Sequence, residues 1–234
     1  MTQLPLSIHL SESATFANFV VGENALVVAA LQQACRREAQ ERFIYLWGGP
    51  GDGRSHLLQA ACHEVARHQE GRGSLYLPLS EAAQLAPEML EGMEQMGLVA
   101  IDDVEAIAGD SRWEEALFHL YNRMRDEGGG ALIVSASSPL SSSPLRLPDL
   151  KSRLAWGLVF QLRGLDDSGK LKALQQGAQG RGLDLPDEVG GYLLRHYRRD
   201  LADLLALLER LDQVSLAAQR RLTIPFVKEV IDAD

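Results

Sequence analysis

The sequence predicts an α/β protein, with a five-stranded parallel sheet covered by helices and then a small domain made only of helices. Through the first two thirds of the chain, short apolar runs alternate with helix-like segments, which is typical of a parallel sheet with helices on both faces. After "RGLDD" at 163–167 only helical patterns follow. We therefore expect an extended tail at 1–12, an α/β core at 13–165 and an all-α domain at 166–234.

Each predicted strand is a short apolar run bounded by loop-forming residues. The five runs are "FIYLW" (43–47), "GSLYLPL" (73–79), "GLVAIDD" (97–103), "ALIVSAS" (131–137) and "GLVFQL" (157–162).

The predicted helices are segments with apolar residues at helical spacing. In the core they begin at residue 23 and cover 55–69, 87–96 and 113–128, the last ending at three consecutive glycines that favour a helix stop. In the small domain they cover about 168–182, 186–198, 199–219 and 223–232, whereas the Ser/Pro-rich stretch 137–148 is expected to be a loop.

Composition excludes several classes of protein. A chain of 234 residues with 46% apolar and 24% charged residues is ordinary for a soluble globular protein. The net charge of −9 argues against a protein that coats duplex DNA, so we expect no direct sequence-specific DNA binding. No apolar run approaches the ~18 residues of a membrane span, and no signal peptide is apparent. Cys35 and Cys62 are too few for a metal cluster, so buried free thiols in a cytoplasmic protein are expected.

The stretch "GGPGDGRS" (48–55) is close to a phosphate-binding loop, the Walker A motif. Its glycines allow several backbone N–H groups to face one anion, and the following helix adds the positive end of its dipole. A structural turn is the alternative, but the strand–loop–helix context favours a nucleotide site in which Ser55 holds Mg²⁺. The predicted nucleotide contacts from the loop are Gly49, Pro50, Gly51, Asp52, Gly53, Arg54, Ser55 and His56.

Two acids follow the third predicted strand. A phosphate-loop protein places its Mg²⁺-organising acid at such a strand end, across from the hydroxyl of the loop. Asp102 is therefore expected to hold Mg²⁺ and Asp103 to orient or activate the attacking water. The alternative is a pair of solvated acids in a turn.

Two arginines extend the pattern. Arg153 lies just before the fifth predicted strand, a position from which arginine fingers enter a neighbour's site. Arg199 opens a helix of the small domain, where a cation opposes the helix dipole, and is expected to reach the nucleotide phosphates. Taken singly, Arg153 is best explained as a surface arginine, and the alternative for Arg199 is the basic start of a helix.

These elements in this order, followed by a helical lid, resemble an AAA+ P-loop ATPase domain. "TFANFVVGENALVVAAL" is similar to the segment by which the replication initiator DnaA enters its nucleotide domain, and "LKSRLAWGL" to its arginine-finger box. The chain ends after the lid, where DnaA continues into a DNA-binding domain. Nearly all of it resembles the Hda family of DnaA-related regulatory inactivators, most specifically in "GRSHLL" and "LTIPFVKE".

The resemblance implies a cofactor, partners and further site residues. It implies bound ADP, or ATP, with Mg²⁺, and adds Val20 and Val21 to the nucleotide contacts. It implies that Arg153 acts in trans on the ATP site of DnaA, which prevents re-initiation, and that the protein can form a homodimer. The tail "QLPLSI" resembles peptides that dock on the DNA-polymerase sliding clamp (the beta subunit), through Gln3, Leu4, Pro5 and Leu6.

The sequence departs from the ATPase pattern at two places. Arg54 stands where lysine is expected, and its planar fork is not equivalent to a compact ammonium. Ser135 and Ser137 stand where relatives carry an acid or amide that senses the γ-phosphate. Both departures predict weak ATP hydrolysis by the protein itself, although Asp103 preserves the second acid. A self-sufficient AAA+ loader or remodeller is the main alternative, and a DNA-binding initiator fragment is disfavoured by the acidic charge.

Overall fold

The computed structural model describes residues 10, 14–69, 71–197, 200–218 and 220–232. Contacts within the chain divide it into two compact units. The first comprises Asn24–Gly49 and Gly53–Leu162 with the described residues up to Ala17. The second comprises Asn18–Glu23, Pro50–Asp52 and the chain from Arg163 onward.

A five-stranded parallel sheet forms the centre of the first unit, and all five predicted strands are confirmed. The strand order is β2-β3-β4-β1-β5, so β4 separates β1 from β3. The loop after β1 and the acids after β3 therefore emerge at the same edge of the sheet on either side of β4. The strands are β1 (Phe43–Trp47), β2 (Ser74–Pro78), β3 (Leu98–Asp102), β4 (Ala131–Ala136) and β5 (Leu158–Gln161).

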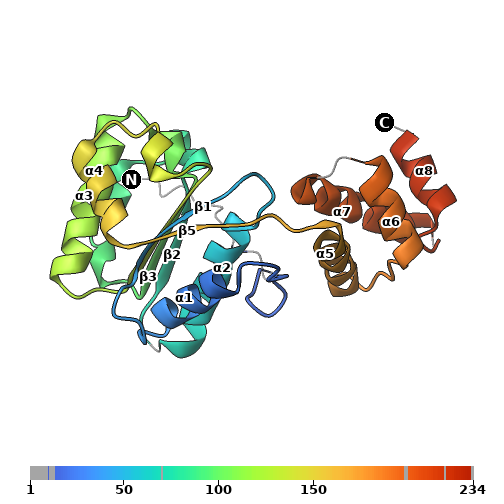
Figure 1. The fold of residues 1–234 in the computed structure, drawn as a ribbon, viewed down its shortest axis with the longest axis horizontal. Helices are drawn as coiled ribbons and strands as arrows, with labels where there is room; N and C mark the ends of the chain where they lie inside the picture. The colour runs from blue at the N-terminus through green and yellow to red at the C-terminus, as the bar shows by residue number, and fades with distance from the viewer. Residues whose placement is uncertain (1–9, 11–13, 70, 198–199, 219, 233–234) are drawn as a thin grey trace, which may run out of the picture. The chain divides into compact units, whose positions relative to one another are not determined.

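Helices cover both faces of this sheet. Figure 1 places α1 (Ala25–Cys35) and α2 (Arg54–His68) on one face and α3 (Ser111–Asp126) and α4 (Pro148–Trp156) on the other. Helix α3 begins where the Asp110 carboxylate accepts N–H groups of its first turn. Its apolar side packs against the sheet, together with buried residues of α4 such as Leu150 and Leu154.

The prediction of an α-helix at 87–96 is wrong. The segment forms two short 3₁₀ turns, Pro87–Leu90 and Met93–Gln95, and Gly92 lies between them with φ of 79°. A left-handed residue cannot continue an α-helix, and glycine adopts that conformation without steric cost. Further 3₁₀ turns occur at Leu79–Gln84, Val104–Ile107 and Leu140–Ser142.

Both cysteines are free and buried, as predicted. Burial raises the pKa of the Cys62 thiol to about 12 and raises that of Cys35 as well. They are components of the packed core with no reactive character.

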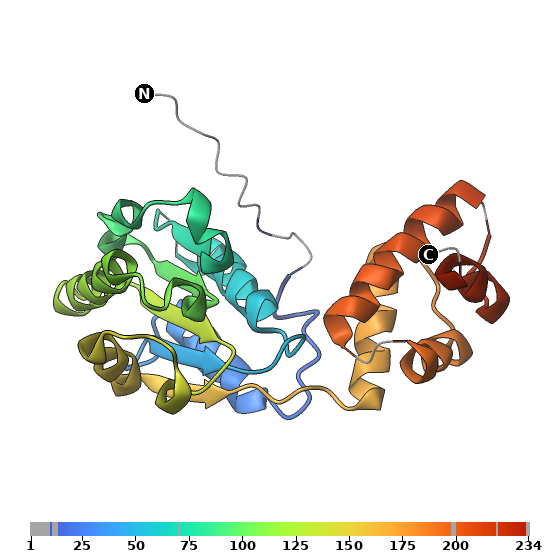
Figure 2. The ribbon, with the colours of Figure 1, turned by 90° about the horizontal axis from the view of Figure 1, so that it is seen from above.

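The second unit carries the four predicted C-terminal helices (Figure 2). They enclose an apolar core built largely from leucines, including Leu174, Leu193 and Leu208. The helices are α5 (Asp167–Gly180), α6 (Asp187–His196), α7 (Leu201–Ala218) and α8 (Ile224–Asp232). None of the helices described, in either unit, combines the length and the apolar character needed to cross a membrane.

Candidate nucleotide site

The glycine-rich loop runs from the end of β1 at Trp47 to the start of α2 at Arg54. Gly51 and Gly53 have φ of 73° and 93°, a conformation that side chains rarely adopt. Gly53 is the N-cap residue of α2 and, as a glycine, has no side chain with which to cap the helix. The N–H groups at the start of a 15-residue helix therefore face the loop, which suits an anion such as a phosphate.

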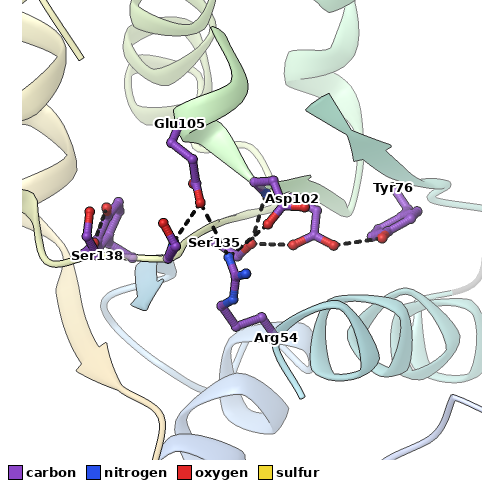
Figure 3. A network of polar contacts seen from close by, with 9 residues as sticks. Arg54, Tyr76, Asp102, Glu105, Ser135 and Ser138 are labelled. Atoms are coloured by element: carbon purple, nitrogen blue, oxygen red, sulfur yellow. Dashed lines mark hydrogen bonds and ion pairs between the residues drawn. The ribbon is translucent and has the colours of Figure 1, made fainter. Parts of the chain in front are cut away.

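The two acids predicted from the sequence occupy different environments. Asp102 is buried, with 1% of its surface exposed, and its Oδ2 accepts a hydrogen bond of 2.8 Å from the Tyr76 hydroxyl. The hydroxyl of Ser135 on β4 donates to Oδ1 of Asp102 and accepts the N–H of Asp103 at 3.1 Å (Figure 3). Asp103 itself has a left-handed backbone, with φ of 54°. Ser135 thus fixes both acids in place, a contact that the sequence alone did not indicate.

Arg54 contacts the second acid directly. Its Nη1 lies 2.8 Å from Oδ1 of Asp103 and 3.9 Å from Oε1 of Glu105 (Figure 3). The pKa of Asp103 is raised, first by burial and next by the charge of Asp102, while Arg54 opposes the rise. The carboxylate expected to activate water is therefore engaged by the residue that replaces the loop lysine.

Glu105 was missed in the sequence. Its Oε1 accepts the backbone N–H of Ser137 at 2.9 Å, and its Oε2 is buried without a hydrogen-bond partner in the described structure. The signal was present as a third acid in "DDVE", two residues after Asp103. Ser137 thus joins the acidic network through its backbone N–H, which donates to Glu105.

The residues predicted to hold Mg²⁺ fit that role. Asp102 presents a carboxylate that the Tyr76 hydroxyl orients, and Ser55 presents a hydroxyl in the first turn of α2. Mg²⁺ is ordinarily held by one or two protein oxygens together with substrate phosphates and water. The described residues contain no cluster of three acid, histidine or cysteine ligands, and a site of this kind does not require one.

Of the other predicted contacts, His56 belongs to the first unit, and Gly51, Val20 and Val21 belong to the second. A ring nitrogen of His56 is 2.9 Å from the carbonyl oxygen of Thr15, and burial lowers the pKa of this histidine. A Cβ on Gly51 would lie 2.9 Å from Oδ1 of Asp200, and the φ of 73° would strain any side chain at this position. Val20 and Val21 are half-buried. The second unit contains a cavity of about 260 Å³ lined by Pro50, Gly51, Asp52, Gly164, Leu165, Lys170, Asp200 and Leu201.

Arg153 lies on α4, where its described contact is with an aromatic ring. Its guanidinium stacks over the ring of Trp156 at 4.1 Å, and 58% of the tryptophan is exposed. Leu150 and Leu154 anchor the same helix in the core. Arg199 and the tail residues Gln3, Leu4, Pro5 and Leu6 lie outside the described residues.

Comparison with known families gives this geometry a context. The model of the bacterial DnaA ATPase domain matches residues 10–161. This chain belongs to the bacterial DnaA ATPase-domain family. A second model, the Hda lid domain, matches residues 167–231. The chain is therefore a DnaA-related AAA+ protein of DNA replication with an Hda-type lid, and the predicted fold class is confirmed.

Solved structures show the same fold as this DnaA-family chain. Domain III of DnaA from Thermotoga maritima matches with a TM-score of 0.84 and 22% identity, over 96% of this chain and 98% of that one. AMPPCP-bound DnaA from Aquifex aeolicus matches with a TM-score of 0.70 and 24% identity, over 86% and 65%. The Thermotoga maritima RuvB Holliday junction branch migration motor matches with a TM-score of 0.70 and 15% identity, over 94% and 72%.

Proposed function

We propose that this protein is a regulatory inactivator of the initiator DnaA. It holds ADP, docks on the DNA-loaded sliding clamp and stimulates ATP hydrolysis by DnaA through Arg153, which prevents re-initiation. The observation that carries the proposal is the ion pair between Arg54 and Asp103, 2.8 Å long. In this pair, the arginine that replaces the loop lysine binds the acid that would activate water for hydrolysis.

The ion pair favours a site that holds nucleotide over one that turns it over. A general base needs a free oxygen within hydrogen-bond reach of the water that it activates. In Asp103, one oxygen is bound by a guanidinium, and the charge of that guanidinium opposes the rise in pKa that burial causes. A bound diphosphate requires no such step, so ADP serves as a structural ligand.

The nucleotide contacts follow from the loop and the start of α2. The backbone N–H groups of Gly49 and of 51–56 bind the phosphates, since Pro50 has no N–H to donate. Val20 and Val21 and, from the lid, Arg199 are further contacts. Ser55 and Asp102 would hold Mg²⁺, and the hydrogen bonds from Tyr76 and Ser135 fix the orientation of the buried Asp102 carboxylate. Bound Mg²⁺ supplies charge neutralisation at the phosphate oxygens.

Arg153 supplies the catalytic contribution in trans. It enters the ATP site of DnaA and stabilises charge on the transferred phosphoryl group. Such a finger contributes on the order of 10³–10⁵ in rate, roughly 4–7 kcal/mol of barrier. Its guanidinium already stacks on the exposed ring of Trp156, so less side-chain freedom is lost when it docks.

The tail tethers the protein to the clamp. Gln3 enters a polar pocket of the clamp, and Leu4 and Leu6, separated by Pro5, enter an apolar one. The organisation is thus a docking tail at 1–12, a nucleotide-binding core at 13–165 and a lid at 166–234. We also propose a homodimer, formed through the surface around Arg153, as a storage form.

The test is ATP hydrolysis by DnaA in the presence of this protein, ADP and DNA-loaded clamp. We expect the wild type to stimulate hydrolysis, and we expect Arg153→Ala to lose stimulation while retaining ADP and clamp binding. A variant with alanine at Gln3, Leu4 and Leu6 should lose stimulation through loss of clamp binding alone. Stimulation by Arg153→Ala at the wild-type level would refute the finger. Rapid ATP turnover by the isolated protein, independent of both partners, would instead establish an autonomous loader or remodeller.

A further inference from the structure

The carboxylate of Glu114 is one of the most enclosed polar groups in the first unit. It lies near the start of α3, and only 1% of the residue is exposed. Its Oε1 accepts N–H groups of Gly109 and Arg146 at 2.7 and 3.0 Å. Its Oε2 accepts N–H groups of Arg146 and Leu147 at 2.9 and 2.5 Å. Three backbone donors from two segments therefore converge on one side chain.

The two segments have different places in the proposed mechanism. Gly109 follows the 3₁₀ turn Val104–Ile107, which comes directly after Asp103. Arg146 and Leu147 come directly before α4, the helix that carries Arg153. Glu114 therefore connects the loop behind the acids to the entry of the arginine-finger helix.

Helix α4 depends on this connection at its N-terminus. Its N-cap residue, Leu147, makes no side-chain cap, and Pro148 at the first helical position has no N–H to donate. Leu150 and Leu154 fix the helix against the core, but apolar contacts are not directional. Hydrogen bonds from the backbone just before the helix are directional, so Glu114 sets the entry point and direction of α4.

We infer that Glu114 is a positioning residue for Arg153. This inference rests on the proposed function, because it assumes that Arg153 acts in the site of DnaA. Glu114 does not contact the reacting atoms. It holds the backbone from which the finger is presented, and it ties that backbone to the loop that follows the protein's own acids.

The informative variant is Glu114→Gln, which preserves size but replaces one acceptor oxygen by an NH₂ donor. Because each oxygen of Glu114 accepts two hydrogen bonds, either orientation of the amide sets a donor against backbone N–H groups. We expect the maximal stimulation of DnaA to fall by about 10–100-fold, as a misplaced catalytic group does. The concentration that gives half-maximal stimulation and the affinity for ADP should stay within about twofold.

Glu64→Gln is the matched control. Glu64 is also a buried carboxylate, 7% exposed, but it lies on α2 and pairs with Arg36 at 2.6 Å. All assays are run well below the melting temperature of each variant. We expect Glu64→Gln to retain full maximal stimulation. An equal loss in both variants would mean general destabilisation and would overturn the inference.

Hydrogen exchange of the wild-type protein tests the contact without any substitution. We expect the amides of Arg146 and Leu147 to be strongly protected, and exchange at the rate of an open loop would overturn the inference. Loss of stimulation in Arg153→Ala together with full maximal stimulation in Glu114→Gln would overturn it while leaving the proposed function intact. Full stimulation by Arg153→Ala would refute the finger itself, and the positioning role with it.

Discussion

The guanidinium of Arg54 donates a hydrogen bond to the carboxylate of Asp103 across 2.8 Å, from the position at which a phosphate-binding loop ordinarily carries lysine. The same Nη1 lies 3.9 Å from Glu105, so two acids face one cation. The Arg54 side chain is 14% exposed and that of Asp103 is 31% exposed, so the pair is only partly shielded from solvent. The arginine at this position therefore also alters the environment of Asp103, because it binds the carboxylate of that acid directly.

Arg54→Lys should release Asp103 and raise ATP hydrolysis by the isolated protein. Lysine is a compact charge without the planar fork that reaches the carboxylate. We expect an increase of about tenfold or more, since a positioned general base supplies roughly 10²–10⁴-fold. Single-turnover hydrolysis of ATP measures it, and adding Asp103→Asn should remove the gain. An unchanged rate in Arg54→Lys would show that the ion pair does not limit turnover.

Trp156→Ala should weaken stimulation of DnaA by roughly 2–5-fold, because an exposed cation–π contact contributes about 0.5–1 kcal/mol. Trp156→Phe keeps an aromatic face and should retain most of the stimulation. Leu26→Ala, at another exposed apolar residue, serves as the control and should have no effect. Equal stimulation by the Ala and Phe variants would show that the aromatic ring at position 156 does not contribute to the action of Arg153.

Ser135→Ala should destabilise the first unit by about 1–3 kcal/mol, because a buried carboxylate oxygen and the Asp103 N–H lose their shared partner. Urea unfolding followed by tryptophan fluorescence measures the change. Ser142→Ala removes an exposed hydroxyl and should change the free energy of unfolding by less than about 0.5 kcal/mol. A Ser135→Ala variant as stable as Ser142→Ala would contradict the bridging role.

His56 should make the stability of the first unit depend on pH. Burial lowers the pKa of folded His56 below its ordinary value of 6.5, so the unfolded chain binds this proton first as pH falls. The contribution of the neutral ring is complete above pH 6.5 and is lost as pH decreases through the folded pKa. Unfolding free energies of wild type and His56→Gln from pH 7.5 to 5 give the difference. We expect the wild type to lose more stability on acidification, and parallel curves would refute this.

Local patterns were sufficient for the strands and most helices. A strand buried on both faces must be apolar along its length, so runs such as "FIYLW" mark parallel strands directly. The helix predicted at 87–96 failed because Gly92 takes a left-handed conformation, and apolar spacing carries no information about that φ angle.

The candidate site was predictable only as a set of residue types. Glycine spacing, a strand-terminal acid pair and a strand–loop–helix order are local features, and they identified Gly53, Asp102 and Asp103. The contacts among them were not predictable, because they depend on which strands are neighbours. Ser135 reaches Asp102 only because β4 lies between β3 and β1.

The sequence by itself determined the parallel α/β core, the helical lid, the glycine-rich loop after β1 and the arginine that stands in it where a phosphate-binding loop carries lysine. Tertiary structure alone decided that this arginine binds Asp103, that Glu105 joins the network and that Glu114 holds the entry of α4. The physical reason is that glycine geometry and apolar burial act along the chain, whereas each of these polar contacts joins segments far apart in sequence. Such pairs exist only after the sheet order and helix packing have brought their donors and acceptors within hydrogen-bond distance.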